Sequence, residues 1–324
     1  NTATGTTIGT FSSTSIDTGD TYTYTLVTGT GDTDNASFTI SSSSLKNGFI
    51  PNYEVKTSYL IRVRSTDSIG QFTEKQFTIN IVNVNEAPYG LTLSNQSQAE
   101  NTATGTTIGT FSTLDVDSGD TFTYSLTAGE GATNNSSFSI SGANLRNAIV
   151  FDYETKNSYS IRVRTTDAAG LYYEGIFSGI TVTNVNEAPT NISLSSASIS
   201  ENVPTGTTIG TFSATDQEGG AMTFALVDSV NYPDNNSFSI ASGVLKSAAV
   251  FDYETKNTYQ INVRVTDSTS LTFERTLFIS ITNVTITPTL SVTNATCHGS
   301  TGSITVSNVV GGTANYTYSR NNVD

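Results

Sequence analysis

Apolar and polar residues alternate along several segments of this chain, which is the pattern of a β-strand with one buried face. The clearest segment is Tyr-Ser-Ile-Arg-Val-Arg at residues 159–164. Because successive side chains of a strand point to opposite faces, Tyr159, Ile161 and Val163 are expected in a core and the two arginines in solvent. The pattern therefore predicts a half-buried strand.

Shorter segments of the same kind lie between clusters of Gly, Asn, Asp and Ser, the residues that favour turns. In the surrounding stretch these candidate strands are residues 106–111, 121–126, 137–140 and 176–185. About seven short strands per hundred residues predict an all-β, immunoglobulin-like sandwich.

The pattern returns along the chain with a spacing near 100 residues. NTATGTTIGTF begins at Asn1 and at Asn101, and NVPTGTTIGTF begins at Asn202. A second landmark, PNYEVKTSYLIRVRSTD at residues 51–67, recurs with few changes about 100 and 200 residues later. A unit this long holds its own core, whereas solenoids and propellers repeat every 20 to 50 residues or so, which makes them the less favoured alternative.

The repeats predict four regions. VNVNEAP and TNVNEAP close the first two units at Pro88 and Pro189, and the repeat pattern stops after Pro288. The expected regions are an N-terminally incomplete domain at residues 1–88, complete domains at 89–189 and 190–288, and the start of a different module at 289–324.

The composition narrows the possible partners mainly through the net charge. The formal net charge is −14 and the sequence pI is about 4.3, with no basic stripe to neutralise phosphates. Nucleic acid is therefore excluded as a partner, and cations are favoured. No stretch is apolar for long enough to span a membrane and no signal peptide is present, so we expect an internal segment of a longer chain.

The acidic residues fall mostly at strand ends and turns. Strand ends of a sandwich converge at its two poles, where several carboxylates repel one another unless a cation lies among them. Calcium, which takes six to eight oxygen ligands, is the expected cation.

These acidic positions resemble those of cadherin repeats. Such repeats carry an acid in the first strand, an acid-x-acid pair, an acidic turn, a later Asp and an Asn-rich linker that ends in Ala-Pro. The matching residues are Glu100 and Glu201; Asp115 with Asp117 and Asp216 with Glu218; Asp152 with Glu154 and Asp252 with Glu254; Asp167 and Asp267; and linkers 83–88 and 184–189. The resemblance covers residues 1–288 and implies tandem Greek-key β-sandwich domains in an elongated rod.

In that family, the base of one domain, the linker and the top of the next domain share calcium, so the resemblance implies two sites here. The first would use Glu54, Asn83, Asn85, Glu86, Asp115, Asp117 and Asp167. The second would use Glu100, Asp152, Glu154, Asn184, Asn186, Glu187, Asp216, Glu218 and Asp267.

Some positions depart from the family pattern. Asn52 stands where the acidic turn has an aspartate, and Ser15 replaces the first acid of the pair beside Asp17. The third linker, at residues 283–288, lacks the Asn-Glu pair, so calcium is not expected there. The alternative interpretation of all these acids is that they are ordinary turn residues and caps.

The segment at residues 290–319 has a different character, with Cys297, a Gly-Gly pair and a Tyr-x-Tyr ending. It resembles the short repeat of the giant flavobacterial gliding adhesin. That resemblance implies a type IX secreted protein on the cell surface of Bacteroidota. Cys297 and His298 are adjacent, so on a strand they point to opposite faces and are not expected to form a metal site.

Enzymatic chemistry is not expected, because a single histidine outside the repeats cannot form a Ser-His-Asp arrangement and no phosphate-binding glycine loop occurs. The predicted function is a structural stalk of a secreted surface adhesin fibre, stiffened by calcium at its junctions and serving adhesion or gliding. The alternatives are binding of surface glycans or other adhesin subunits, and an ice-binding or surface-adsorbing face. Tyr172 and Tyr173 are glycan-binding candidates, although alternation places one of the two inside.

Overall fold

The computed structural model describes residues 2–16, 19–285, 289–293 and 303–307. The chain divides into two compact units, Asn1–Thr183 and Asn184–Asp324. The described residues form β-strands and three short 3-10 turns, with no α-helix among them. The all-β prediction is therefore confirmed.

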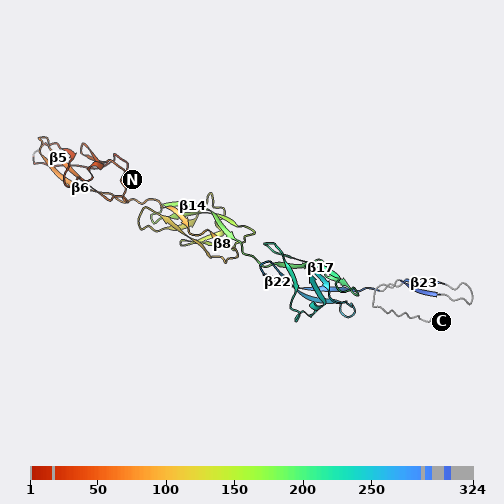
Figure 1. The fold of residues 1–324 in the computed structure, drawn as a ribbon. Helices are drawn as coiled ribbons and strands as arrows, with labels where there is room; N and C mark the ends of the chain where they lie inside the picture. The colour runs from red at the N-terminus through yellow and green to blue at the C-terminus, as the bar shows by residue number, and fades with distance from the viewer. Residues whose placement is uncertain (1, 17–18, 286–288, 294–302, 308–324) are drawn as a thin grey trace, which may run out of the picture. The chain divides into compact units, whose positions relative to one another are not determined.

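The first repeat forms two three-stranded sheets (Figure 1). Their orders are β1-β4-β3 and β2-β5-β6, and every pairing is antiparallel. The strands are β1 (Thr7–Thr10), β2 (Thr23–Leu26), β3 (Phe38–Ser41), β4 (Ser44–Asn47), β5 (Ser58–Thr66) and β6 (Phe72–Asn80).

The second repeat, in the same unit, has two additional strands and two four-stranded sheets, in the orders β11-β12-β9-β7 and β10-β13-β14-β8. The strands are β7 (Tyr89–Leu93), β8 (Ser97–Ala99), β9 (Thr107–Leu114), β10 (Thr123–Leu126), β11 (Phe138–Ser141), β12 (Asn144–Asn147), β13 (Ser158–Thr166) and β14 (Tyr172–Thr183). Only β8 pairs in parallel, with the end of β14. The four candidate strands named from the sequence correspond to β9, β10, β11 and the second half of β14.

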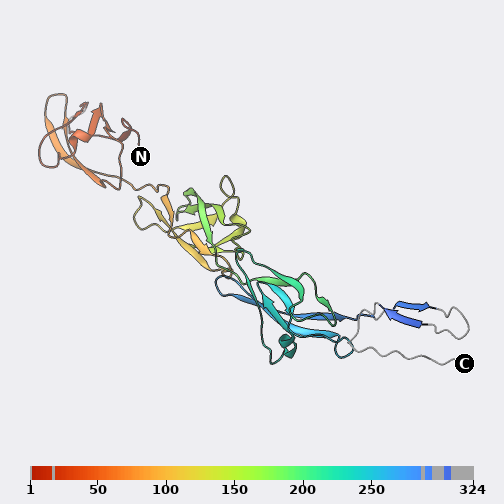
Figure 2. The same cartoon turned by 45° about the vertical axis from the view of Figure 1, so that its right-hand side comes forward.

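The third repeat, in the second unit, has the same arrangement (Figure 2). Its sheets have the orders β15-β17-β20-β19 and β16-β22-β21-β18, and a hairpin of β23 and β24 follows. The strands are β15 (Thr190–Leu194), β16 (Ser198–Ser200), β17 (Thr208–Thr215), β18 (Thr223–Leu226), β19 (Phe238–Ala241), β20 (Val244–Ser247), β21 (Thr258–Thr266), β22 (Thr272–Thr282), β23 (Thr289–Thr293) and β24 (Ser303–Ser307).

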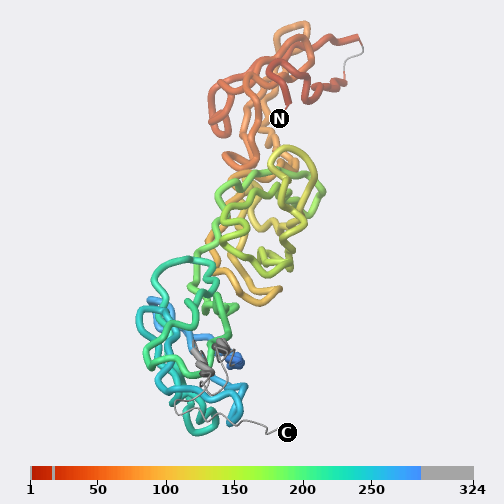
Figure 3. Tube along the Cα trace, turned by 90° about the vertical axis from the view of Figure 1, so that its right-hand side faces the viewer, coloured from red at the N-terminus to blue at the C-terminus, as the bar shows by residue number. Residues whose placement is uncertain are grey.

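Each repeat has its own apolar core, around which its trace closes (Figure 3). In the second repeat Ile161 and Val163 are fully buried and Tyr159 is nearly so. Arg162 and Arg164 lie on the other face and both contact Glu174. The alternation at residues 159–164 therefore predicted the burial of this strand correctly.

Candidate metal centre

The linker after the first repeat is held against acidic side chains of the second repeat. Asn83 donates from Nδ2 to Oδ1 of Asp117 at 2.9 Å, and the backbone amide of Glu86 donates to Oδ2 of the same aspartate at 2.9 Å. Asn85 donates from Nδ2 to Oδ2 of Asp167 at 2.8 Å. Five residues expected from the sequence to share a site therefore lie together.

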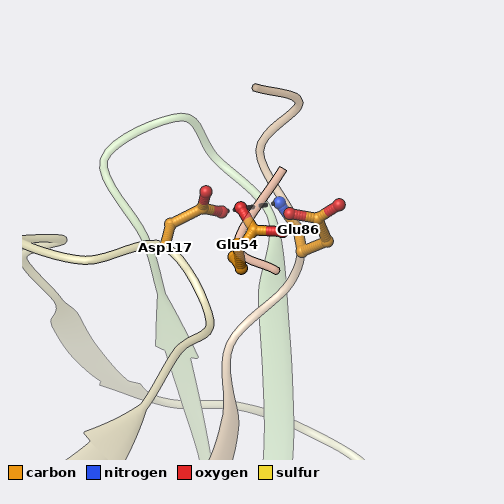
Figure 4. A group of neighbouring side chains, drawn as sticks. All are labelled: Glu54, Glu86 and Asp117. Atoms are coloured by element: carbon orange, nitrogen blue, oxygen red, sulfur yellow. Dashed lines mark hydrogen bonds between the residues drawn. The ribbon is translucent and has the colours of Figure 1, made fainter. Parts of the chain in front are cut away.

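Glu54 completes this group from the first repeat. Carboxylate oxygens of Glu54, Glu86 and Asp117 all lie within 4.8 Å of one another, as Figure 4 shows. Asp117 is buried, Glu86 is half-buried and Glu54 is exposed. Three carboxylates at this separation repel one another, and a divalent cation among them removes that cost.

Asp115, Asp117 and Asp120 form a second acidic group at the same end of the second repeat, again with oxygens within 4.8 Å. Asp120 was not among the residues named from the sequence, although Ser-Gly-Asp directly follows Asp117. Burial, followed by the charges of Asp115, Asp117 and Asp167, raises the pKa of Asp120. An oxygen of Asp115 and one of Asp120 are buried with no hydrogen-bond partner among the described residues.

The second unit contains the equivalent arrangement within itself. Asn186 donates from Nδ2 to Oδ2 of Asp267 at 2.7 Å, and the amide of Glu187 contacts Oε2 of Glu218 at 3.4 Å. Both oxygens of Asp216 are buried with no hydrogen-bond partner in the described part of the chain. Asn184 lies in the linker before them.

The remaining predicted ligands lie at the other end of the second repeat, in the first unit. Glu100 is buried, and its Oε2 accepts the backbone amide of Tyr153 at 2.7 Å. Oxygens of Glu100 and Glu154 lie within 4.8 Å. Asp152 accepts hydrogen bonds from the amide and hydroxyl of Thr155, which lower the pKa of Asp152. Asp152 therefore acts as a turn cap, as the alternative interpretation expects.

The end of the third repeat also gathers acids. Glu201, Asp252 and Glu254 have oxygens within 4.8 Å of one another. Asn283 donates to Oε1 of Glu254 at 2.9 Å, and the amide of Val284 donates to Oε1 of Glu201 at 2.8 Å. The sequence does not lead us to expect calcium at this end, and that expectation stays a prediction.

One expectation about surface aromatics is wrong. Alternation places one of Tyr172 and Tyr173 inside, yet they are 53% and 43% exposed. Both lie at the start of β14, and Tyr172 lies on the outer face beneath Arg164, 4.1 Å from ring centroid to guanidinium carbon. Asp17, Cys297 and His298 lie outside the described residues.

Two family models match the chain. Residues 195–282 match the Cadherin domain and residues 289–324 match the SprB repeat. The chain thus contains cadherin-like repeats followed by a SprB-like repeat. Cadherin domains are adhesion modules and not enzymes, and they generally bind calcium at domain junctions.

Similar proteins include human protocadherin Fat 4, with 28% identity over 228 residues, 67% of this chain. Mouse cadherin EGF LAG seven-pass G-type receptor 1 shares 28% identity over 177 residues, 52% of this chain. The chain spans only 4% and 6% of the length of these two relatives.

Solved structures confirm the tandem sandwich fold. Mouse cadherin-23 EC22–24 superposes with a TM-score of 0.59 at 23% identity, covering 87% of this chain and 93% of that chain. Extracellular cadherin domains 1–5 of protocadherin gamma B2 give a TM-score of 0.58 at 20% identity, covering 88% and 58%. In the described part of the chain, no helix has the length and apolar character needed to cross a membrane.

Proposed function

We propose that this chain is a stalk segment of a long secreted adhesin on a bacterial surface, and that calcium stiffens its domain junctions. The observation that carries the proposal is the group of Glu54, Glu86 and Asp117, which joins one repeat, the linker and the next repeat. The acids and amides at these positions offer oxygen ligands, which suits calcium.

The first site would use Glu54, Glu86, Asp115, Asp117 and Asp167 as carboxylate ligands, with amide oxygens from Asn83 and Asn85. Extracellular calcium modules have dissociation constants of about 10⁻⁴ to 10⁻³ M, so millimolar calcium would fill such a site. A filled site fixes the linker backbone to both repeats, and loss of linker freedom makes the segment stiff.

A second calcium site is proposed with the residues that the sequence resemblance implies. It would use Glu100, Asp152, Glu154, Glu187, Asp216, Glu218 and Asp267, together with Asn184 and Asn186. The proposed domain boundaries are residues 88, 189 and 288, and the linker ligands of the two sites come from residues 83–86 and 184–187.

The match of residues 289–324 to the SprB repeat supports the placement of the parent protein. We take it to favour a type IX secreted protein of Bacteroidota that serves gliding or adhesion. Its partners would be surface glycans or other copies of the adhesin.

Small-angle scattering of the full chain in 5 mM calcium and in excess chelator tests the stalk function. The maximum dimension should fall when calcium is removed, and the Asp117→Asn variant should remain short in calcium. Glu130→Gln, which changes an exposed turn acid, is the matched control and should behave as the parent chain. Equal dimensions with and without calcium, or no heat on calcium titration, would rule out the stiffening.

Exposure of both Tyr172 and Tyr173 favours a second function, contact with glycans on the surface around the start of β14. Binding of the full chain on a glycan array, lost in the Tyr173→Ala variant, is the expected result. Equal signals from parent and variant would exclude this face.

A further inference from the structure

The sequence contains a single Asn-Gly pair, Asn47 and Gly48, in the first repeat. Asn47 is the last residue of β4 and is only 1% exposed. In the second and third repeats the residue after the equivalent strand position is an alanine, Ala148 and Ala248. The first repeat therefore differs from both others in the residue that follows this buried position.

The backbone at Gly48 does not require a glycine. Glycine is needed where φ is positive, and Gly48 is not among the residues with a positive φ. Its amide donates to the carbonyl of Ser37 at 2.8 Å, and the amides of Ala148 and Ala248 make the same hydrogen bond to the equivalent serines at 2.9 and 2.8 Å. Alanine therefore fits this backbone, so the glycine changes the chemistry of the asparagine more than it changes the fold.

An asparagine that precedes glycine is chemically reactive, because no Cβ hinders the approach of the next backbone nitrogen to the side chain. In this reaction the nitrogen of Gly48 would attack Cγ of Asn47. The bond from Cγ to Nδ2 breaks, and the amide proton leaves with that nitrogen as ammonia. Water then opens the succinimide to aspartate or isoaspartate, so the reaction needs no enzyme and no reactant other than water.

The folded repeat holds the reacting groups apart. Nδ2 of Asn47 donates to the carbonyl oxygens of Thr2, Ala3 and Phe49 at 3.3, 3.0 and 2.7 Å. The attack requires the side chain to leave these carbonyls and the nitrogen of Gly48 to give up its own hydrogen bond. Deamidation is therefore expected only when this end of β4 opens.

The products do not fit the folded site. Oδ1 of Asn47 is already buried with no hydrogen-bond partner among the described residues, so a carboxylate there would be buried beside three carbonyl oxygens and without a donor. Isoaspartate adds a methylene group to the main chain. It would displace the hydrogen bonds from the amide of Gly5 to the carbonyl of Asn47, at 2.8 Å, and from the amide of Asn47 to the carbonyl of Thr6, at 3.2 Å.

We propose that Asn47 is a site of spontaneous deamidation that is coupled to unfolding of the first repeat, and that the modified repeat does not refold. A chemical change in the unfolded state makes unfolding irreversible, so the lifetime of this repeat depends on how often it opens. The second repeat has Asn147 before an alanine at this place, and its unfolding stays reversible here. The inference depends neither on calcium nor on the proposed function.

The test compares the full chain in native buffer with the full chain in concentrated urea, both at mildly alkaline pH. Samples are digested with pepsin, because acid stops the reaction during digestion, and the peptides are measured by mass spectrometry. Asn47 should be converted about tenfold or more faster in urea than in native buffer, and in urea faster than Asn147. Equal rates at Asn47 in the two conditions, or equal rates at the two asparagines in urea, would overturn the proposal.

Gly48→Ala is the matched variant, because alanine follows the same position in the other two repeats. It should lose the fast conversion in urea. After long incubation in urea and dilution, hydrogen exchange in β3 and β4 should return to its native rate in Gly48→Ala and stay fast in the modified fraction of the parent chain. Native exchange in the modified parent chain would overturn the proposal.

Two further variants separate the effect of the product from the effect of long incubation. Asn47→Asp introduces one product directly and should show fast exchange in β3 and β4 without any incubation. Asn47→Ser, which places the serine of the third repeat at this position, should keep slower exchange there than Asn47→Asp. Equal exchange in these two variants would show that the carboxylate is tolerated and would overturn the proposal.

Discussion

At the scale of single residues, a buried asparagine fixes the start of each of the first two repeats. Nδ2 of Asn147 donates to the carbonyls of Thr102, Ala103 and Ile149 at 3.2, 3.1 and 2.9 Å. The asparagine is 0% exposed, so its amide forms these hydrogen bonds within the protein and not with water. In the third repeat Ser247 stands at this position and contacts the carbonyl of Pro204 at 3.2 Å.

Substitution of this asparagine should therefore depend on what replaces it. Asn147→Ala removes the donor of three hydrogen bonds and should cost about 2 to 3 kcal/mol of unfolding free energy. Asn147→Ser should cost roughly half as much, because a hydroxyl serves at the same position in the third repeat. Urea unfolding of the two variants measures the difference, and equal losses would contradict this account.

Gln98 shows the opposite situation, a polar side chain in an apolar position. Both of its amide atoms are buried with no hydrogen-bond partner among the described residues. Its equivalent on β16 is Ile199, which packs in the core of the third repeat.

Gln98→Ile should therefore stabilise the second repeat, by about 1 to 2 kcal/mol, because an unsatisfied amide is removed and apolar area is buried. Gln96→Ile, just before β8, serves as the control and should change stability little. A thermal midpoint that does not rise in Gln98→Ile would refute the prediction.

At the scale of the strand, Arg162 and Arg164 on β13 clamp Glu174 on the neighbouring strand β14. Nη2 of each arginine lies 2.6 and 2.7 Å from the two carboxylate oxygens. Hydrogen bonds from Arg162 and then Arg164 lower the pKa of Glu174. In the third repeat Asn262 replaces the first arginine and donates from Nδ2 to Glu274 at 2.9 Å. Arg264 forms the ion pair with Glu274 there.

The lowered pKa fixes the direction of a pH effect. A carboxyl that is more acidic when folded contributes stability above its unfolded pKa and loses it as the pH falls through the folded value. Stability of the second repeat should therefore fall between about pH 5 and pH 2, and Glu174→Gln should flatten part of that fall. Thermal midpoints across this range measure it, with Glu130→Gln as the control that should keep the full slope.

The sequence predicted strands and turns well, because alternation depends on local residues. It did not predict one contact in the core of the first repeat. Pro51 stands at the position of Phe151 there, and the ring of Phe49 packs against Tyr59 instead, at 4.9 Å between ring centroids. It also missed Asp120, whose approach to Asp115 and Asp117 depends on a loop conformation rather than on spacing. Long-range contacts of this kind carry no periodic signal.

For the whole molecule, the linker at residues 83–88 is where calcium should have its largest effect. A protease that cleaves after glutamate should cut at Glu86 slowly in millimolar calcium and several-fold faster in chelator, because a clamped backbone resists the unfolding that cleavage requires. Glu130, in an exposed turn, should be cut at the same rate in both conditions. Asp117→Asn should abolish the calcium effect at Glu86, and a calcium effect that survives this substitution would place the ion elsewhere.

The parallel pairing of β8 with β14 has a mechanical consequence. β8 comes near the start of the second repeat in the sequence and β14 comes at its end. The amide of Thr181 donates to the carbonyl of Gln96, and the amide of Glu100 donates to the carbonyl of Thr183. When the chain is pulled from both ends, the two strands are drawn lengthwise past each other, so their hydrogen bonds are loaded together and in shear. A repeat tied in this way should withstand more tension than one whose terminal strands peel apart bond by bond.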